Sequence, residues 1–277
     1  MRSEWPTSPN RSRSRGPHSR RQPHEGNGGH SRVNRSRFDA VAREYDAGRP
    51  GYPDALFEAI EEMSGSFLAG ARLADVGAGT GISTRGLLER GARVVAVDHG
   101  AAMLGTLRGR TPGTPVVLAD ANQLPFANGS LDLVTFAQSW HWVDLGRAPR
   151  EVLRVLRPGG ALAVWWNTPD EGGEPWLAEH RARLRVAGQH VVGAHFEAAW
   201  RSIPSAFENL DVETARISWD RTVPMEVILD EVRSKSYIEE LGADDAAAFV
   251  ERERELLPGG HLREPFVTQL AVVRMPA

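Results

Sequence analysis

Apolar and polar positions follow two different periods along the middle of the chain. Short runs that are almost entirely apolar predict strands at 72–76, 93–97, 116–120, 131–137 and 161–166. Between these runs, apolar residues with helical spacing predict helices at 82–90, 101–109 and 147–157. Strands that are apolar throughout suit a sheet that is buried on both faces. The alternation therefore predicts an α/β fold, with a mostly parallel sheet and helices on both of its faces.

The segments on either side of this region are less regular. Before it, the apolar spacing suits two helices, which the break at 49–53 separates. After it, the pattern predicts helices and strands at 174–200 (helix), 212–219 (strand), 224–241 (helix), 244–257 (helix) and 265–275 (strand). The two later strands bring the predicted sheet to seven strands, and we expect the late helices to cap a pocket.

The charge of the chain is unevenly distributed. The formal net charge is −3 over 277 residues. Residues 1–37 hold nine arginines and two glutamates, whereas the remaining chain holds 24 basic and 34 acidic residues. An acidic body argues against a broad phosphate-binding face, so a nucleic-acid partner is not expected.

The first 36 residues differ in composition from the rest of the chain. They are rich in Arg, Ser and Gly without apolar periodicity, so we expect a disordered tail at 1–36 and one domain at 37–277. The tail could also be translated upstream sequence, with the true start near Val33. Its loosely spaced histidines predict no metal site. The chain has no apolar run of about 18 residues and no secretory signal, which favours a cytoplasmic protein without a membrane span.

A glycine-rich loop, in the segment RLADVGAGTGIST at 72–84, joins the first predicted strand to the next helix. Gly77, Gly79 and Gly81 would let a ligand lie against bare backbone. A phosphate-binding Walker loop needs Gly-Lys-Ser/Thr, and a dinucleotide fingerprint needs a small residue where Ile82 stands. The glycine pattern alone is therefore compatible with several nucleoside cofactors.

Three acids lie at or near the carboxyl ends of the first three strands, the edge where open α/β sheets bind ligands. Asp75 lies just before the loop, where an anion suits a cationic ligand better than a pyrophosphate. Asp98 follows the second strand, and a carboxylate there can accept both hydroxyls of a ribose. Asp120 ends the third strand next to Ala121, where the edge of an adenine could lie. Capping of a turn or helix is the alternative role for Asp75 and Asp120.

Five motifs together resemble the class I S-adenosylmethionine-dependent methyltransferases: LADVGAGTG, VVAVDHG, LADANQLPF, SLDLVTFAQSWHW and EVLRVLRPGGALAV. Within that superfamily, the chain looks like the small-molecule branch that includes the ubiquinone/menaquinone-biosynthesis and trans-aconitate methyltransferases. The resemblance covers residues 38–167. It implies a Rossmann-like fold with a cofactor half at about 37–167, and acceptor-side helices and closing strands at about 168–277.

The resemblance also implies the cofactor, S-adenosyl-L-methionine, and the residues that hold it. The three loop glycines would admit its methionine part, and Asp75 would support the loop. Asp98 would hold the ribose, and Asp120 with Ala121 would hold the adenine.

The exit of the fourth strand, AQSWHWVD, is expected to face the sulfonium of the cofactor. Gln138 could donate or accept a hydrogen bond there. Trp140 and Trp142 could each place an aromatic face beside the positive charge or pack in the core, with at most one of them facing the cofactor. His141 is the candidate general base, and a structural role in the turn is its alternative.

Further pocket residues are predicted outside this exit. Asn167, after the fifth strand, is a substrate-pocket candidate. Tyr45, Arg49 and Tyr52 could form a lid, and Arg49 could pair with the carboxylate of the cofactor. The segment RSKSY at 233–237 is interpreted as a solvated helix face rather than a pocket wall.

The acceptor is predicted to be a small molecule that is methylated at O or C. Methyltransferases that act on the exocyclic amines of nucleic-acid bases resemble one another in an Asn/Asp-Pro-Pro-aromatic motif after the fourth strand. This motif is missing here, and the chain has no cysteine. The absence of cysteine also excludes disulfides and thiolate metal ligands. Three alternatives stay open: an RNA methyltransferase recruited by the basic tail, a non-catalytic cofactor-binding module, and an NAD-dependent oxidoreductase. The oligomeric state is open as well.

Overall fold

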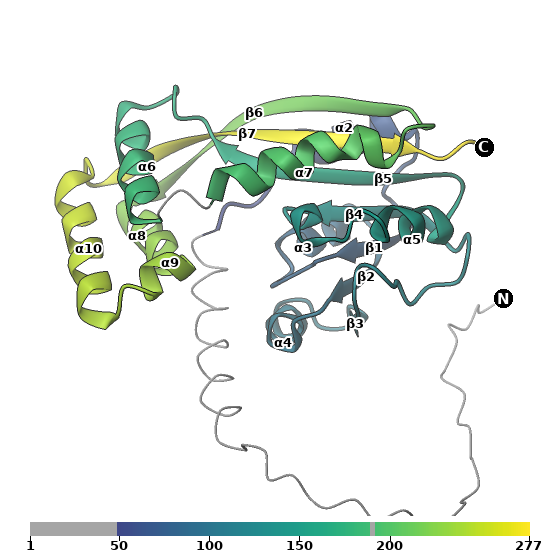
Figure 1. The fold of residues 1–277 in the computed structure, drawn as a ribbon, viewed down its shortest axis with the longest axis horizontal. Coiled ribbons are helices and arrows are strands. Elements are labelled where there is room, and N and C mark those ends of the chain that lie inside the picture. Colours follow the sequence, from purple (N-terminus) through teal and green to yellow (C-terminus); the bar gives the residue numbers. More distant parts are fainter. Residues whose placement is uncertain (1–48, 189–191) are drawn as a thin grey trace, which may run out of the picture.

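The strands form one seven-stranded sheet in the order β3-β2-β1-β4-β5-β7-β6 (Figure 1). The computed structural model describes residues 49–188 and 192–277. The predicted tail at 1–36 and the predicted helix that contains Tyr45 lie outside the described residues. The strands are β1 (Arg72–Val76), β2 (Arg93–Asp98), β3 (Val116–Leu118), β4 (Leu131–Ala137), β5 (Leu156–Pro169), β6 (Val212–Pro224) and β7 (His261–Arg274).

All strands except β7 run in the same direction. The pairs β1–β2, β1–β4, β2–β3 and β4–β5 are parallel. β7 runs antiparallel to both β5 and β6, so β6 is parallel to β5. The carboxyl ends of all strands but β7 therefore point to one edge of the sheet, which we call the carboxyl edge. The predicted mostly parallel, seven-stranded α/β fold is confirmed.

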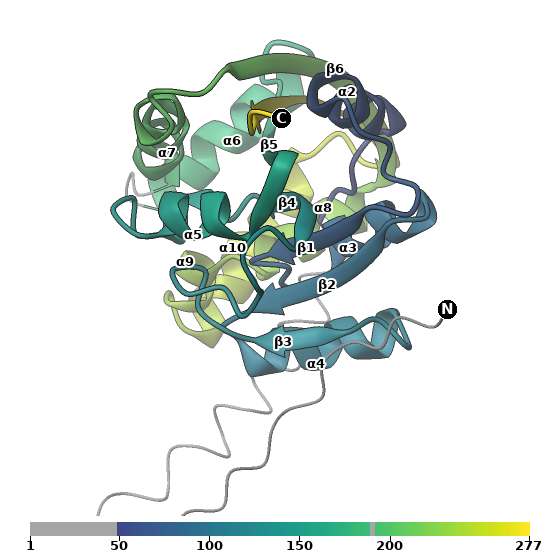
Figure 2. The same cartoon turned by 90° about the vertical axis from the view of Figure 1, so that its right-hand side faces the viewer.

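Helices cover both faces of this sheet (Figure 2). The helices are α2 (Asp54–Ser64), α3 (Ile82–Glu89), α4 (Ala101–Arg110), α5 (Ala148–Val155), α6 (Pro175–Ala187), α7 (Val192–Ala206), α8 (Met225–Arg233), α9 (Ser236–Glu239) and α10 (Ala243–Leu256), with a 3-10 turn η1 (Trp140–Trp142). On one face, Leu56 of α2 and Leu87 of α3 share an apolar cluster with Trp165 of β5. On the other face, Val152 of α5 shares a cluster with Phe136 of β4 and with residues of α7. Both faces of the central strands are therefore buried, as continuous apolar runs predict.

The helices α6, α8, α9 and α10 form a cap beyond the carboxyl edge (Figure 1). α6 follows β5 and α8 follows β6, and both strands end at that edge. The cap has an apolar cluster of its own, to which Leu184 of α6, Leu229 of α8 and Val250 of α10 belong. The cap is thus held together by its own packing and stands over the ends of the strands.

Two predicted helices are interrupted in the structure. The helix predicted at 174–200 divides into α6 and α7, and α6 ends at the C-cap residue Gly188. The helix predicted at 224–241 ends after Arg233 and resumes briefly as α9. β5 begins earlier than predicted, because Leu156 already pairs with Leu131 of β4 before a shift in register.

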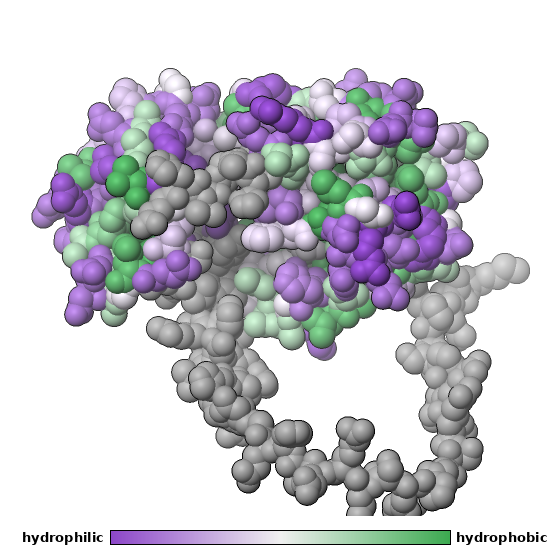
Figure 3. Space-filling view, viewed as in Figure 1, coloured by the Kyte–Doolittle hydropathy of each residue, from purple (hydrophilic) through white to green (hydrophobic). Residues whose placement is uncertain are grey.

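The surface of the described residues is mixed in character. On the face in Figure 3, polar side chains spread over the cap helices and α5, with apolar residues between them in small groups. Across 49–188 and 192–277, no helix combines the length and the apolar character that crossing a bilayer needs.

Candidate active site

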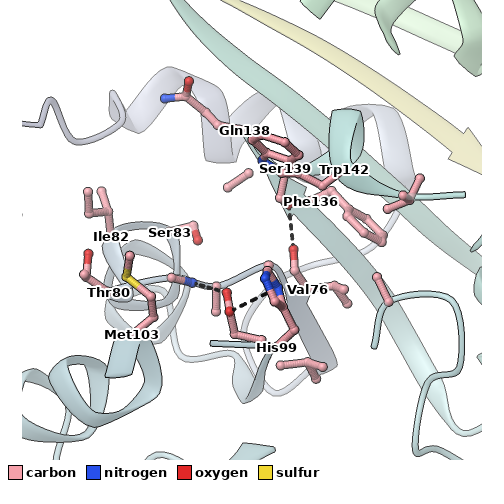
Figure 4. Close-up of a pocket in the computed structure, with 18 of the residues that line it drawn as sticks. Val76, Thr80, Ile82, Ser83, His99, Met103, Phe136, Gln138, Ser139 and Trp142 are labelled. Carbon is pink, nitrogen blue, oxygen red and sulfur yellow. Dashed lines mark hydrogen bonds and ion pairs between the residues drawn. The ribbon is translucent and has the colours of Figure 1, made fainter. Parts of the chain in front are cut away.

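A cavity of about 740 Å³ opens at the carboxyl edge of the sheet. Its wall comes from the ends of four neighbouring strands: the glycine loop after β1, residues 97–99 at the end of β2, residues 119–122 after β3, and the exit of β4. Arg49, Pro50 and Tyr52, from the arm before α2, complete the wall. Figure 4 shows side chains from α3, α4 and the β4 exit around this space. The volume falls within the range of roughly 300–1,000 Å³ that is typical of small-molecule sites.

The three loop glycines have left-handed backbone conformations, with φ of 70° at Gly77, 56° at Gly79 and 88° at Gly81. A Cβ on Gly77 would lie 2.4 Å from the Cβ of Ser139, and a Cβ on Gly81 would lie 2.8 Å from the Cγ of Leu107. At Gly79, no atom lies within 4 Å of such a Cβ. Neighbouring side chains therefore require glycine at two of the positions, whereas the backbone at Gly79 faces open space where a ligand can approach.

Asp75 lies behind the glycine loop and is fully buried. Its Oδ2 accepts hydrogen bonds of 2.6 Å from the hydroxyls of Ser83 and Thr84 in α3, and its Oδ1 accepts one of 2.9 Å from Thr135 in β4. Burial raises the pKa of this carboxyl, and the three hydroxyl donors oppose the rise. Asp75 does not line the cavity, so its position suits support of the loop rather than contact with a ligand.

Asp98 lines the cavity at the end of β2, with 8% of its side chain exposed. Its Oδ2 accepts a hydrogen bond of 2.8 Å from the backbone N–H of Gly79, and its Oδ1 accepts one of 2.7 Å from Gly100. Nδ1 of His99 lies 3.7 Å from Oδ1 (Figure 4). A carboxylate has about four lone-pair sites, so each oxygen can accept a second hydrogen bond from a ligand hydroxyl.

Asp120 and Ala121 lie on the cavity wall after β3. Oδ1 of Asp120 accepts hydrogen bonds from the backbone N–H and the side-chain amide of Asn122, at 2.9 and 2.8 Å. Oδ1 of Asn122 accepts another from the backbone N–H of Asp144, at 2.9 Å. Asn122 was not predicted, because a single Asn after a strand has no motif of its own. It connects the wall at Asp120 to the loop after η1.

Gln138 and Ser139 lie on the wall where β4 ends. Gln138 has a φ of 53°, and within 49–188 and 192–277 it is the one residue other than glycine with a left-handed backbone. Such conformations cluster at functional sites. Oγ of Ser139 donates to the carbonyl of Val76 at 2.7 Å and occupies the space beside Gly77 (Figure 4). Ser139 was not predicted, although the glycine opposite it is the signal that a side chain approaches closely.

The two tryptophans of the β4 exit lie in opposite environments. Trp140 is fully buried, stands edge-on to Phe136 at a centroid distance of 4.8 Å, and does not line the cavity. Trp142 lines the cavity and keeps 77% of its area exposed. The assignment of Trp140 to the substrate pocket is therefore wrong, because η1 turns its side chain into the core. A substrate contact by Trp142 stays a prediction.

His141 lies between these tryptophans but does not line the cavity wall. Its Nδ1 lies 3.4 Å from Nε1 of Trp166. An indole N–H can only donate, so Nδ1 of His141 is the acceptor, and the neutral ring then carries its proton on Nε2. This geometry favours the structural alternative for His141, and the general-base role stays a prediction.

Arg49 and Tyr52 line the cavity, whereas Asn167 does not. Nδ2 of Asn167 donates to the carbonyl of Gly51 at 2.9 Å, and its Oδ1 accepts from the hydroxyl of Thr268 at 2.6 Å. Asn167 therefore anchors the arm to β7. Both ends of its amide bind other parts of the chain, and its assignment to the substrate pocket stays a prediction.

Comparison with known proteins shows which family this chain belongs to. The family described as "Methyltransferase domain" matches residues 74–164. An uncharacterized methyltransferase of Mycobacterium tuberculosis is 37% identical over 220 residues, which cover 79% of this chain and 85% of the relative. The chain belongs to the class I S-adenosylmethionine-dependent methyltransferases. Membership of that family makes S-adenosylmethionine the cofactor of this chain.

The methyltransferase is also similar to a named methyltransferase and to a solved structure. A demethylmenaquinone methyltransferase of Corynebacterium urealyticum is 36% identical over 131 residues, which cover 46% of this chain and 56% of the relative. The solved structure of a putative type II methyltransferase from Anaeromyxobacter dehalogenans is 26% identical, with a TM-score of 0.64, and the match covers 83% of this chain and 99% of that one. The predicted family, enzyme class and cofactor are confirmed, and no finding favours an oxidoreductase or a non-catalytic module.

Proposed function

We propose that this methyltransferase transfers the methyl group of S-adenosylmethionine to an oxygen or carbon atom of a small molecule. One observation carries the proposal: Gly79, Asp98, Asp120 and Gln138 come from the ends of four adjacent strands and surround a single cavity. Ligands of open α/β sheets bind at this edge. The cavity therefore has the place and the size for a nucleoside cofactor together with a small acceptor.

Each segment of the wall suits one part of the cofactor. The open backbone at Gly79 receives the methionine part. The remaining lone pairs of Asp98 accept the ribose hydroxyls. Asp120 and Ala121 would flank the adenine, and Gln138 would be on the side of the sulfonium. The arm supplies Arg49, whose guanidinium can bind the cofactor carboxylate in a bidentate manner.

Bound S-adenosylmethionine supplies an electrophilic methyl group. The residues of the chain contribute position: they hold the acceptor atom in line with the C–S bond, and such placement can provide much of the rate. With the acceptor present as a carboxylate or carbanion, its electron pair would form the bond to the methyl carbon as the C–S bond breaks, and the electrons of that bond would stay on sulfur as S-adenosylhomocysteine. A hydroxyl acceptor would in addition release its proton to solvent or to a nearby base. The exposed ring of Trp142 at the cavity can stabilise the positive charge by about 0.5–1 kcal/mol.

Two observations support a small acceptor. The cavity has the volume of a small-molecule site. The chain after residue 37 holds 34 acidic and 24 basic residues, a balance that disfavours a polyanionic partner.

Calorimetric titration tests this proposal. S-adenosylmethionine, S-adenosylhomocysteine and NAD are titrated into the wild type, Asp98→Ala and a control, Asp211→Ala, whose exposed side chain precedes β6 at the opposite edge. We expect both adenosyl ligands to bind and Asp98→Ala to weaken them by about tenfold to a hundredfold, because hydrogen bonds to a charged group are worth about 1.5–3 kcal/mol. Circular dichroism confirms that the variants fold. The proposal is contradicted if NAD binds and neither adenosyl ligand does, or if Asp98→Ala and Asp211→Ala have equal affinity for the adenosyl ligands.

A further inference from the structure

Asn122 joins two parts of the cavity wall that come from different strands. It lies on the wall after β3. Its Nδ2 donates a hydrogen bond to Oδ1 of Asp120 at 2.8 Å, and its Oδ1 accepts one from the backbone N–H of Asp144 at 2.9 Å. Asp144 belongs to the loop between η1 and α5. The amide of Asn122 therefore bridges the wall assigned to the adenine and the loop that follows the β4 exit.

The bridge holds one oxygen of Asp120 and leaves the other open. Oδ1 accepts hydrogen bonds from both the backbone N–H and the amide of Asn122. Oδ2 accepts none from the residues that the structure describes. A carboxylate that is bound twice through one oxygen has a defined orientation, because rotation would break both bonds. Oδ2 can then accept a hydrogen bond from a ligand, such as the amine of an adenine.

The other end of the bridge holds the loop that carries Trp142. Trp142 lines the cavity next to the β4 exit, and 77% of its area is exposed (Figure 4). A ring with this exposure has few packing contacts, so its place depends on the backbone that carries it. The N–H of Val143 donates to the carbonyl of Trp140 at 3.3 Å, and the N–H of Asp144 donates to Asn122. Asn122 thus connects the backbone beside Trp142 to the opposite wall.

Other hydrogen bonds attach the loop after β3 to α5. Oε2 of Glu151 accepts from the N–H of Leu124 at 2.9 Å, and Arg154 donates to the carbonyls of Leu124 and Phe126 at 2.9 and 2.8 Å. None of these four residues lines the cavity. The loop therefore keeps its attachment to α5 when the amide of Asn122 is removed, and the Asn122 bridge acts on the cavity side.

We propose that Asn122 is a positioning residue that couples the cofactor to the acceptor side of the cavity. This inference rests on the proposed function. A cofactor that binds Oδ2 of Asp120 fixes that carboxylate, Asn122 passes the constraint to Asp144, and the Trp142 wall is then ordered for the acceptor. A ligand that orders a segment in this way lowers the cost of ordering for the next ligand. Asp144 does not line the cavity, so protection of its N–H by a cofactor has to pass through neighbouring residues.

Hydrogen exchange measures this coupling without an identified acceptor. Exchange in the full chain is timed by mass spectrometry, with and without saturating S-adenosylhomocysteine, in peptides that cover residues 77–82 and 140–147. We expect the ligand to slow exchange in both peptides of the wild type. In Asn122→Ala it should slow only the peptide of the glycine loop. Exchange at 140–147 should be about threefold to tenfold faster than in the wild-type complex, because the N–H of Asp144 has lost its acceptor.

Asn128→Ala is the matched control. Asn128 is exposed, lies in the same loop without lining the cavity, and accepts a hydrogen bond of 2.9 Å from Arg154. This variant should exchange like the wild type. Equal slowing at 140–147 in the wild type and Asn122→Ala overturns the inference. Loss of the folded state in Asn122→Ala, followed by circular dichroism, would show a structural role and also overturn it. If the ligand slows neither peptide in the wild type, the proposed function itself is contradicted.

A double-mutant cycle gives a second readout, by calorimetry with S-adenosylhomocysteine. Asn122→Ala should weaken binding by about threefold to tenfold, because Asp120 loses a donor that orients it. In the Asp120→Ala background, the same substitution should change the affinity by less than about twofold, because no carboxylate remains to be oriented. Effects of the two substitutions that simply add would show that Asn122 does not act through Asp120, and would overturn the inference.

Discussion

Replacing Gly77 with alanine adds a methyl group where the structure has no room for one. The new Cβ would lie 2.4 Å from Cβ and 2.7 Å from Oγ of Ser139. The backbone φ of 70° adds a penalty of about 1–2 kcal/mol for any residue with a Cβ. Overpacking of this kind typically costs about 1–3 kcal/mol more. We therefore expect the free energy of unfolding to fall by about 2–5 kcal/mol in Gly77→Ala.

Gly79→Ala is the matched control for that experiment. Its φ is 56°, but no atom lies within 4 Å of the added Cβ, so only the backbone penalty of about 1–2 kcal/mol applies. Urea unfolding followed by circular dichroism measures both variants. Ser139→Gly opens space beside residue 77. Its effect on the free energy of unfolding should therefore be about 1–3 kcal/mol more favourable in the Gly77→Ala background than in the wild type. Equal stability of the two alanine variants, together with zero coupling to Ser139→Gly, would refute the steric reasoning.

Two further substitutions test the roles of His141 and Asp132. His141→Asn keeps an acceptor near Trp166, and we expect its turnover with an identified acceptor to stay within about twofold of the wild type from pH 5.5 to 8. A fall of about a hundredfold, with a changed pH dependence in this range, would instead establish a general base. Asp132→Asn removes a carboxylate that accepts hydrogen bonds from Arg72 and Arg157, and the bond from Arg72 holds the pKa of Asp132 well below its usual range. Because the folded pKa is lowered, the stabilisation is present above about pH 4 and is lost as the pH falls. Because Arg72 is partly exposed, solvent weakens its ion pair with Asp132. We therefore expect the free energy of unfolding of the wild type to exceed that of the variant by about 1 kcal/mol at pH 6. Urea midpoints should converge toward pH 2, and a difference that is constant with pH would contradict this.

The strands of the cofactor half could be predicted because each is a short run of mostly apolar residues. β1 and β4 have the predicted bounds of 72–76 and 131–137. The cap was harder to predict. The segment 224–241 has helical periodicity throughout, yet α8 ends at Arg233, and Ile238 beyond the break packs in the apolar cluster of the cap with Leu184 of α6. Contacts between elements decide where such a helix breaks. The local periodicity of the sequence carries no information about those contacts.

The same limit explains the error at Trp140. Both tryptophans of η1 follow β4 closely and have the same apolar character, so the local sequence cannot rank them. A 3-10 helix has about three residues per turn, so side chains two residues apart point in different directions. Which of them enters the core depends on Phe207, whose ring lies 5.9 Å from that of Trp140. Phe207 is distant in sequence, and only the packing of the segment after α7 brings it to η1.

Asp75 and Asp98 show how position along a strand assigns different tasks to the same residue type. Both belong to adjacent parallel strands, but Asp75 pairs with Ala96, so Asp98 lies two residues further toward the carboxyl edge. Asp75 is consequently enclosed, and three hydroxyls occupy its oxygens. Asp98 reaches the cavity wall, where the backbone N–H groups of Gly79 and Gly100 bind it. The loop between them is thus stabilised from behind by one carboxylate and from the front by another that can still accept hydroxyls from a ligand. A cofactor that binds Asp98 would therefore also fix Gly79, because the same carboxylate holds both.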